Sequence, residues 1–216
     1  MTRGTASVDF CLYLITDRGQ SGGRDLLTVV EEALSGGVRG VQLREKALSS
    51  LEYFELAREM RDLTARYGAR LLINDRVDIA LAVGADGVHL PEAGLPLSVA
   101  RELLGPAKLI GVSCHSLDMA LHAEQRGADF ITFGPVWFTP SKARYGEPIG
   151  VAALAEAVQT LSVPVFALGG VNRERVPELL ATGIHRVALI SAILAAPVPR
   201  VEAEAFISLL TPDTIQ

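Results

Sequence analysis

Short apolar runs rich in β-branched residues alternate along the chain with longer segments in which apolar residues recur every three or four positions. The first pattern is typical of buried β-strands and the second of amphipathic helices such as 26–37, 51–68 and 116–127. Eight strand–helix pairs predict an α/β fold, a single (β/α)₈ TIM-barrel domain over residues 1–216 with the barrel proper at about 11–210. The predicted strands are 11–16, 38–44, 70–75, 86–90, 108–113, 129–134, 164–169 and 186–191.

Composition narrows the class of protein. A hydrophobic content of 49% in 216 residues supports a substantial core. The net charge of −5 provides no overall basic field, so nucleic acid is not an expected partner and any anion site must be local. The longest apolar run, 188–198, is shorter than the roughly 20 residues that cross a bilayer, and the first ten residues do not resemble a signal peptide. We therefore expect a cytoplasmic protein with no membrane partner.

The two cysteines give no sign of a disulfide framework or a zinc site. Cys11 and Cys114 each lie in or beside an apolar run, where a thiol usually packs as a small hydrophobe.

Polar side chains collect at the carboxyl ends of the predicted strands. In such a barrel the loops after these ends converge over one mouth, where the chemistry takes place. The residues that this rule brings together are Gln42, Arg44, Glu45, Lys46, Asn74, Asp75, His89, Glu92, Ser113, His115, Thr139, Ser141, Lys142, Gly169, Gly170, Ser191 and Ala192.

Cationic side chains follow two of these strands. Arg44 and Lys46 alternate, so they point to one face and together can hold a multiply charged anion; a pair of solvated charges is the alternative. Lys142 follows the sixth strand with the hydroxyls of Thr139 and Ser141, where an ordinary polar turn is the alternative. Convergence of both groups on one rim favours an anion site.

Glycines and a serine mark the last two strands. Gly169 and Gly170 allow backbone N–H groups to approach an oxyanion, and the turn at Ser191 can do the same, although the glycines could serve turn geometry alone. The mouth then has room for two phosphate-bearing groups, one held by backbone and hydroxyls and the other by arginine and lysine.

Two further residues are candidates for metal binding and proton transfer. Asp75 is the candidate Mg²⁺ ligand, because a bound pyrophosphate recruits Mg²⁺ through one or two carboxylates; an ion pair with the nearby cations is the alternative. His115 could carry a proton at the mouth or simply pack at the start of a helix. His89, inside a strand, is interpreted as structural.

Seven motifs occur in one order along residues 12 to 194: YLITD, VQLREK, LLINDRVDIALAVGADGVHL, GVSCHS, GPVWFTPSK, ALGGV and ISAI. In order and spacing they resemble the thiamine phosphate synthase and thiazole tautomerase family. The synthase joins an aminopyrimidine methyl diphosphate (4-amino-2-methyl-5-(diphosphooxymethyl)pyrimidine) to a thiazole ethyl phosphate, forming thiamine phosphate and pyrophosphate. The resemblance thus implies a transferase acting on small phosphorylated substrates with Mg²⁺ as cofactor.

The resemblance also implies roles for single residues. Asp75 would bind Mg²⁺, and catalysis would rest on Arg44, Lys46, Lys142 and, for proton transfer, His115. The pyrimidine diphosphate would contact Gln42, Arg44, Lys46, Asn74, Ser113 and Lys142, and the thiazole phosphate would contact Thr139, Ser141, Gly170, Ile190 and Ser191.

One position departs from the synthase pattern. Synthases usually read HLGQEDLP where this chain reads HLPEAGLP, so Gly94 stands where an aspartate provides a second magnesium ligand. Glu92 could compensate only by reaching from two residues earlier. The loop resembles that of the thiazole tautomerases, in which the histidine at the position of His115 is the acid/base.

The retained Gln/Arg/Lys set and Asp75 favour the synthase, since a proton shift on a monophosphate does not require them. A thiazole tautomerase and a non-catalytic ligand-binding barrel remain alternatives. Such barrels often self-associate, so a homo-oligomer is also expected.

Overall fold

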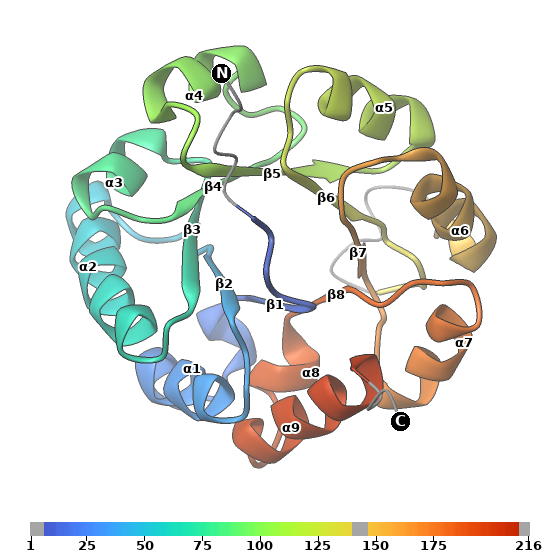
Figure 1. Cartoon of the computed structure of the whole chain (residues 1–216). Helices are drawn as coiled ribbons and strands as arrows, with labels where there is room; N and C mark the ends of the chain where they lie inside the picture. Colours follow the sequence, from blue (N-terminus) through green and yellow to red (C-terminus); the bar gives the residue numbers. More distant parts are fainter. Residues whose placement is uncertain (1–6, 140–146, 212–216) are drawn as a thin grey trace.

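Eight parallel strands close into a barrel in the computed structural model, which describes residues 7–139 and 147–211. Neighbours in the barrel are neighbours in the chain, and the last strand pairs with the first (Figure 1). The predicted TIM barrel is therefore confirmed, with each strand inside or within one residue of its predicted range. The strands are β1 (Leu12–Ile15), β2 (Gly40–Leu43), β3 (Arg70–Asn74), β4 (Gly87–Leu90), β5 (Leu109–Cys114), β6 (Phe130–Phe133), β7 (Val165–Leu168) and β8 (Val187–Leu189).

Helices form the outer ring around the strands (Figure 1). Two of them follow β8, where the sequence pattern predicted one. The helices are α1 (Leu26–Ser35), α2 (Ser50–Arg66), α3 (Val77–Ala82), α4 (Leu97–Leu104), α5 (Leu117–Gln125), α6 (Gly150–Thr160), α7 (Val176–Leu180), α8 (Ser191–Leu194) and α9 (Pro199–Leu210), with short 3₁₀ helices η1 (Arg18–Gln20) and η3 (Arg173–Arg175).

The core has two parts. A large apolar cluster fills the space between strands and helices, as the alternation of strand side chains requires. A smaller cluster fills the barrel interior, where the rings of Phe10, Tyr13, Phe130 and Phe166 pack with centroids 5.3–6.0 Å apart. The barrel is therefore a packed core with its site on one end.

Glycines end several helices just before a strand, as the repeated helix–Gly–strand pattern predicts. Gly127 after α5 and Gly84 after α3 have φ of 94° and 64°, the left-handed region that a glycine enters without a Cβ penalty.

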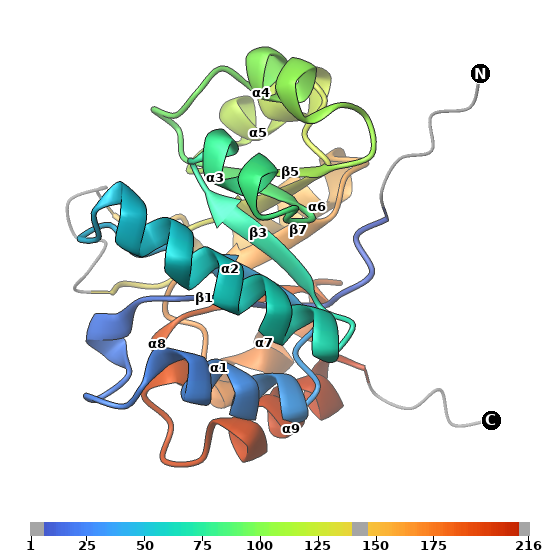
Figure 2. The same cartoon turned by 90° about the vertical axis from the view of Figure 1, so that its left-hand side faces the viewer.

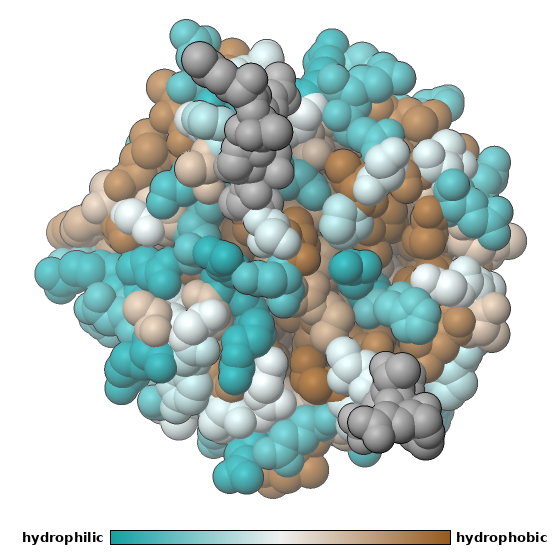
Figure 3. All heavy atoms as spheres, viewed as in Figure 1, coloured by the Kyte–Doolittle hydropathy of each residue, from teal (hydrophilic) through white to brown (hydrophobic). Residues whose placement is uncertain are grey.

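The carboxyl ends of the strands lie together at one end of the barrel. In Figure 2, β3 points toward the left, so the mouth lies at that side. Figure 3 shows the opposite end, over which hydrophilic and hydrophobic residues are interspersed. Within the described part of the chain, no helix is long and apolar enough to cross a membrane.

Candidate active site

A cavity of about 390 Å³ opens at the mouth of the barrel. We call it the cationic cavity. Its wall combines side chains from the ends of β2, β3, β4 and β5, which lie far apart in the sequence. Eight of the predicted site residues line it, namely Gln42, Arg44, Lys46, Asn74, Asp75, Ser113, His115 and Ile190, and Glu92 joins them. Lys142 lies outside the described residues.

Positive charge enters this cavity from the segment that follows β2. Arg44 and Lys46 both line the cavity. Glu45 between them faces elsewhere: its buried carboxylate accepts hydrogen bonds from the backbone N–H of Arg18 at 3.1 and 3.2 Å. Neither cation forms an ion pair with a residue of 7–139 or 147–211. The charge of both is available to a bound anion.

Asp75 has an unusual backbone. Its φ of 63° is left-handed, which costs a residue with a Cβ about 1–3 kcal/mol. Its N–H donates to the carbonyl of His89 at 3.0 Å, which ties the end of β3 to β4. No ion pair of Asp75 occurs in the part of the chain that the structure describes, so the alternative of a simple ion pair finds no support there.

The loop after β4 packs against this carboxylate. A Cβ placed on Gly94 would lie 2.9 Å from Asp75 Oδ1 and 2.9 Å from Cδ of Pro91. A side chain at position 94 would therefore meet Asp75 directly.

A second cavity of about 320 Å³ adjoins the first, since Asp17, Leu168 and Ile190 line both. We call it the glycine cavity. Its wall includes four of the five residues predicted for the thiazole phosphate, namely Thr139, Gly170, Ile190 and Ser191. Ser141 lies outside the described residues.

Backbone, more than side chains, shapes the glycine cavity. Gly169 and Gly170 have φ of 97° and 70°, and Cβ atoms there would lie 2.7 Å from the Cβ atoms of Pro135 and Trp137. The loop after β7 fits this closely because it pairs with the loop after β6: Trp137 N–H donates to Gly169 O at 3.1 Å. Glycine is required at both positions for conformation and for space.

The Thr139 hydroxyl lines the glycine cavity. Its oxygen is buried and finds no hydrogen-bond partner among the residues that the structure describes. A buried hydroxyl without a partner is costly, whereas a bound phosphate oxygen would accept its proton.

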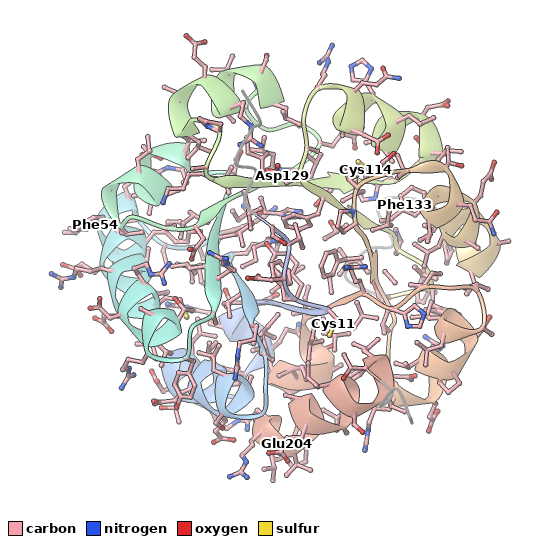
Figure 4. The ribbon with its side chains drawn as sticks, in the orientation of Figure 1. Cys11, Phe54, Cys114, Asp129, Phe133 and Glu204 are labelled. Atoms are coloured by element: carbon pink, nitrogen blue, oxygen red, sulfur yellow. The ribbon has the colours of Figure 1, made fainter. Side chains whose placement is uncertain are left out.

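His115 and Cys114 stand where β5 meets the mouth. Nδ1 of His115 contacts the carbonyl oxygen of Gly134, which only accepts, so this nitrogen carries a proton. Burial, helped by the charge of Glu92, raises the pKa of the Cys114 thiol to about 12, so the thiol is neutral. Both cysteines are free, and Figure 4 shows them well apart in the barrel.

Two residues at the mouth were not predicted. Asp17 follows β1 and lines both cavities, and the strand-end rule would have identified it had it been applied to the first strand. Arg175 in η3 lies with Cζ 4.9 Å from the ring centroid of Trp137 and donates to Gly170 O at 2.5 Å. No sequence pattern indicates that contact, because it depends on how two loops pack.

The chain is similar to known proteins along most of its length. It matches the family described as "Thiamine monophosphate synthase" over residues 12–193. A Geobacter sulfurreducens protein, provisionally named as a thiamine-phosphate synthase, is 65% identical over 209 residues, which cover 97% of this chain and 98% of that protein. The thiamine-phosphate synthase of Clostridium novyi is 46% identical and covers 87% and 92% of the two chains. The solved thiamine phosphate pyrophosphorylase of Pyrococcus furiosus superposes with a TM-score of 0.84 at 39% identity, covering 93% of this chain and 95% of that one.

Proposed function

The chain belongs to the thiamine monophosphate synthase family, and we propose that its two adjoining cavities bind the two substrates of that synthase. The cationic cavity takes the aminopyrimidine methyl diphosphate, and the glycine cavity takes the thiazole ethyl phosphate. The observation that carries this assignment is that one cavity bears two cations without an ion-pair partner among the described residues, whereas the adjoining cavity is lined by glycine backbone and hydroxyls. The products are thiamine phosphate and pyrophosphate.

The reaction needs charge stabilisation more than a protein nucleophile. The bond between the pyrimidine methylene carbon and the diphosphate oxygen breaks, and its electron pair leaves with pyrophosphate. The lone pair of the thiazole nitrogen then forms the new bond to that carbon. Arg44 and Lys46 stabilise the negative charge that accumulates on the leaving group, with Lys142 as the third cation of the prediction. Two cavities that share a wall hold the reactants side by side.

The thiazole phosphate is held by a different set of groups. The backbone of Gly169 and Gly170 lines the cavity and can offer N–H groups to a phosphate oxygen, and the Thr139 hydroxyl gains a hydrogen-bond partner. Ser191, at the start of α8, adds a hydroxyl from the neighbouring strand end. This arrangement suits a dianion without a cluster of cations.

The residues present fit a single Mg²⁺ that is shared with the substrate. The described part of the chain holds no group of three side chains able to bind a metal by themselves. Asp75 would provide one carboxylate, and the remaining ligands would be diphosphate oxygens and water, which is how proteins usually bind Mg²⁺. When bound, the ion would neutralise part of the charge on the leaving pyrophosphate.

The experiment is a direct assay of the purified protein with both substrates and Mg²⁺, following thiamine phosphate and pyrophosphate together. We expect equal amounts of both products, in proportion to enzyme and lost on adding EDTA. Folded protein that binds the thiazole phosphate without forming product would overturn the proposal.

His115→Ala provides the matched comparison with the tautomerase alternative. The condensation requires no proton transfer by the His115 imidazole, so the condensation rate of the variant should stay within about tenfold of the wild-type rate. Loss of isomerisation of the carboxythiazole phosphate in the same variant would assign that second chemistry to His115.

A further inference from the structure

A layer of polar side chains crosses the barrel interior between the aromatic core and the mouth. Tyr13, Gln42, His89 and Thr132 come from four different strands and are at most 2% exposed, and Ser113 on a fifth strand is partly buried. Barrel interiors are usually filled with apolar side chains, and burying polar groups is costly unless they are hydrogen-bonded. Burying this polar layer therefore costs desolvation free energy that an apolar layer would not.

The layer is connected by hydrogen bonds. Gln42 Nε2 donates to Tyr13 Oη at 3.2 Å, and Tyr13 Oη lies 3.5 Å from His89 Nδ1. On the other side of the ring, His89 Nε2 lies 3.0 Å from Ser113 Oγ and 3.2 Å from Thr132 Oγ1, and Thr132 donates to Ser113 at 3.3 Å. His89 thus joins the side chain of Gln42 to that of Ser113 across the barrel axis.

Chemistry fixes the direction of these bonds. An amide nitrogen only donates, so Tyr13 accepts from Gln42 and its own proton is directed to His89 Nδ1. Burial raises the pKa of Tyr13, which keeps that proton on the phenol. With Nδ1 accepting, a neutral imidazole carries its proton on Nε2 and donates toward the two hydroxyls. Ser113 then accepts within the layer and keeps its own proton for the mouth.

We propose that His89 is a positioning residue that sets the hydrogen-bond polarity of the pyrimidine subsite. Its ring directs Gln42 to present an amide oxygen, an acceptor, and Ser113 to present a hydroxyl proton, a donor. Both residues line the cationic cavity.

The inference rests on the proposed function, in which this cavity takes an aminopyrimidine. An aminopyrimidine places an amino group, a donor, next to a ring nitrogen, an acceptor, so it complements the pair. A 4-oxopyrimidine of the same shape reverses the pattern, with an accepting oxygen next to a donating ring N–H. A site with fixed polarity rejects the reversed pattern, because buried polar groups would face unmatched partners.

The test compares the diphosphates of the aminopyrimidine and of its 4-oxo analogue as substrates. We expect the wild-type protein to prefer the amino compound by at least about 10² in kcat/KM. His89→Met fills similar space but neither donates nor accepts, so the preference should fall below about tenfold. His89→Gln places an N–H near the site of Nε2, so it should restore much of the preference. The KM for the thiazole phosphate should not change in either variant.

Two further variants separate positioning from stability. Tyr13→Phe removes one hydroxyl from the layer and leaves the ring packing, so it should also reduce the preference for the amino compound. This variant tests the proposal even if His89→Met does not fold. His185→Met alters an exposed histidine at the start of the eighth strand–helix pair and should change nothing. A folded His89→Met or Tyr13→Phe with the wild-type preference would overturn the proposal, as would equal losses with both substrates.

Binding of the corresponding pyrimidine monophosphates, followed by calorimetry, makes the same comparison without turnover. If wild-type protein forms no thiamine phosphate yet binds the amino compound selectively, and His89→Met loses that selectivity, the polarity proposal stands and the proposed function falls. Unchanged selectivity of binding in His89→Met overturns the polarity proposal whatever the turnover.

Discussion

The two cavities at the mouth of this barrel are built by different means. The cationic cavity takes its character from side chains: Arg44 and Lys46 provide charge, and Asp75 provides a carboxylate. The glycine cavity takes its character from backbone: Gly169 and Gly170 are left-handed and leave no space for a Cβ. A side-chain site loses one interaction when one residue is truncated, whereas a backbone site loses its shape when one atom is added.

The same comparison extends to the neighbours of each cavity. Arg44 and Lys46 have no ion-pair partner in the described ranges, so their removal should leave the fold intact. Gly170 lies between Trp137 and Arg175, so its replacement should disturb two loops at once. Removing Arg44 or Lys46 from the cationic cavity should therefore lower activity without lowering stability. Replacing Gly170 in the glycine cavity should lower both.

The largest effect is expected from Arg44→Ala. Loss of one charged donor at the leaving pyrophosphate should lower kcat/KM by about 10²–10³ in steady-state assays of condensation. The melting temperature should stay within error, because the guanidinium has no described ion-pair partner. Arg58→Ala, an exposed arginine on α2, is the matched control. If Arg44→Ala condenses the substrates at the wild-type rate, the diphosphate does not bind in the cationic cavity.

Gly170→Ala should raise the KM for the thiazole phosphate by about ten- to a hundredfold, because the new methyl group displaces Trp137 or Arg175. Gly84→Ala is the control, since Gly84 has a similar φ of 64° but open space around it. Both variants should lose about 1–3 kcal/mol of stability in urea titrations from backbone strain. Equal KM values in the two would show that the glycines serve the turn alone.

Gly94→Asp tests the metal site, by placing a second carboxylate beside Asp75. We expect the Mg²⁺ concentration for half-maximal activity to fall about tenfold, since an added charged ligand strengthens cation binding. Gly94→Asn has the same shape without the charge and reports the cost of crowding Pro91. Identical Mg²⁺ titrations of the wild-type protein and Gly94→Asp would place the metal elsewhere.

Arg175→Met should have the smallest effect. It removes the hydrogen bond to Gly170 O and the cation–π contact with Trp137, together worth about 1 kcal/mol at a partly exposed site, so the KM for the thiazole phosphate should rise about fivefold. Arg173→Met, two residues earlier in η3, removes a surface ion pair with Glu202 and serves as control. A larger effect from Arg173→Met would refute the role of the Arg175 contacts with Gly170 and Trp137 in binding the thiazole phosphate.

The barrel itself was predictable from the sequence. Each parallel strand, buried on both faces, forms a short apolar run, and each helix shows its own period, so eight repeats leave few other folds. The strand-end rule then predicted the residues of the cationic cavity from Gln42 to His115, because parallel strands place their carboxyl ends on one rim. Magnesium and self-association stay predictions, as do the binding and catalytic roles of all the predicted site residues.

Other features depend on contacts between distant segments. The interpretation of His89 as structural agrees with its burial, but no sequence pattern indicated that its ring joins Gln42, through Tyr13, to Ser113. That link forms only when β1, β2, β4 and β5 face one another across the barrel. The contact of Arg175 with Gly170 likewise needs two loops to pack.

The sequence by itself therefore determined which residues reach the mouth, because the period of a strand and the direction of a parallel sheet are local properties. Only the tertiary structure decided which of these residues touch, in what conformation, and with what hydrogen-bond polarity. Those properties depend on the barrel closing and on the space left between its loops, which no local pattern records.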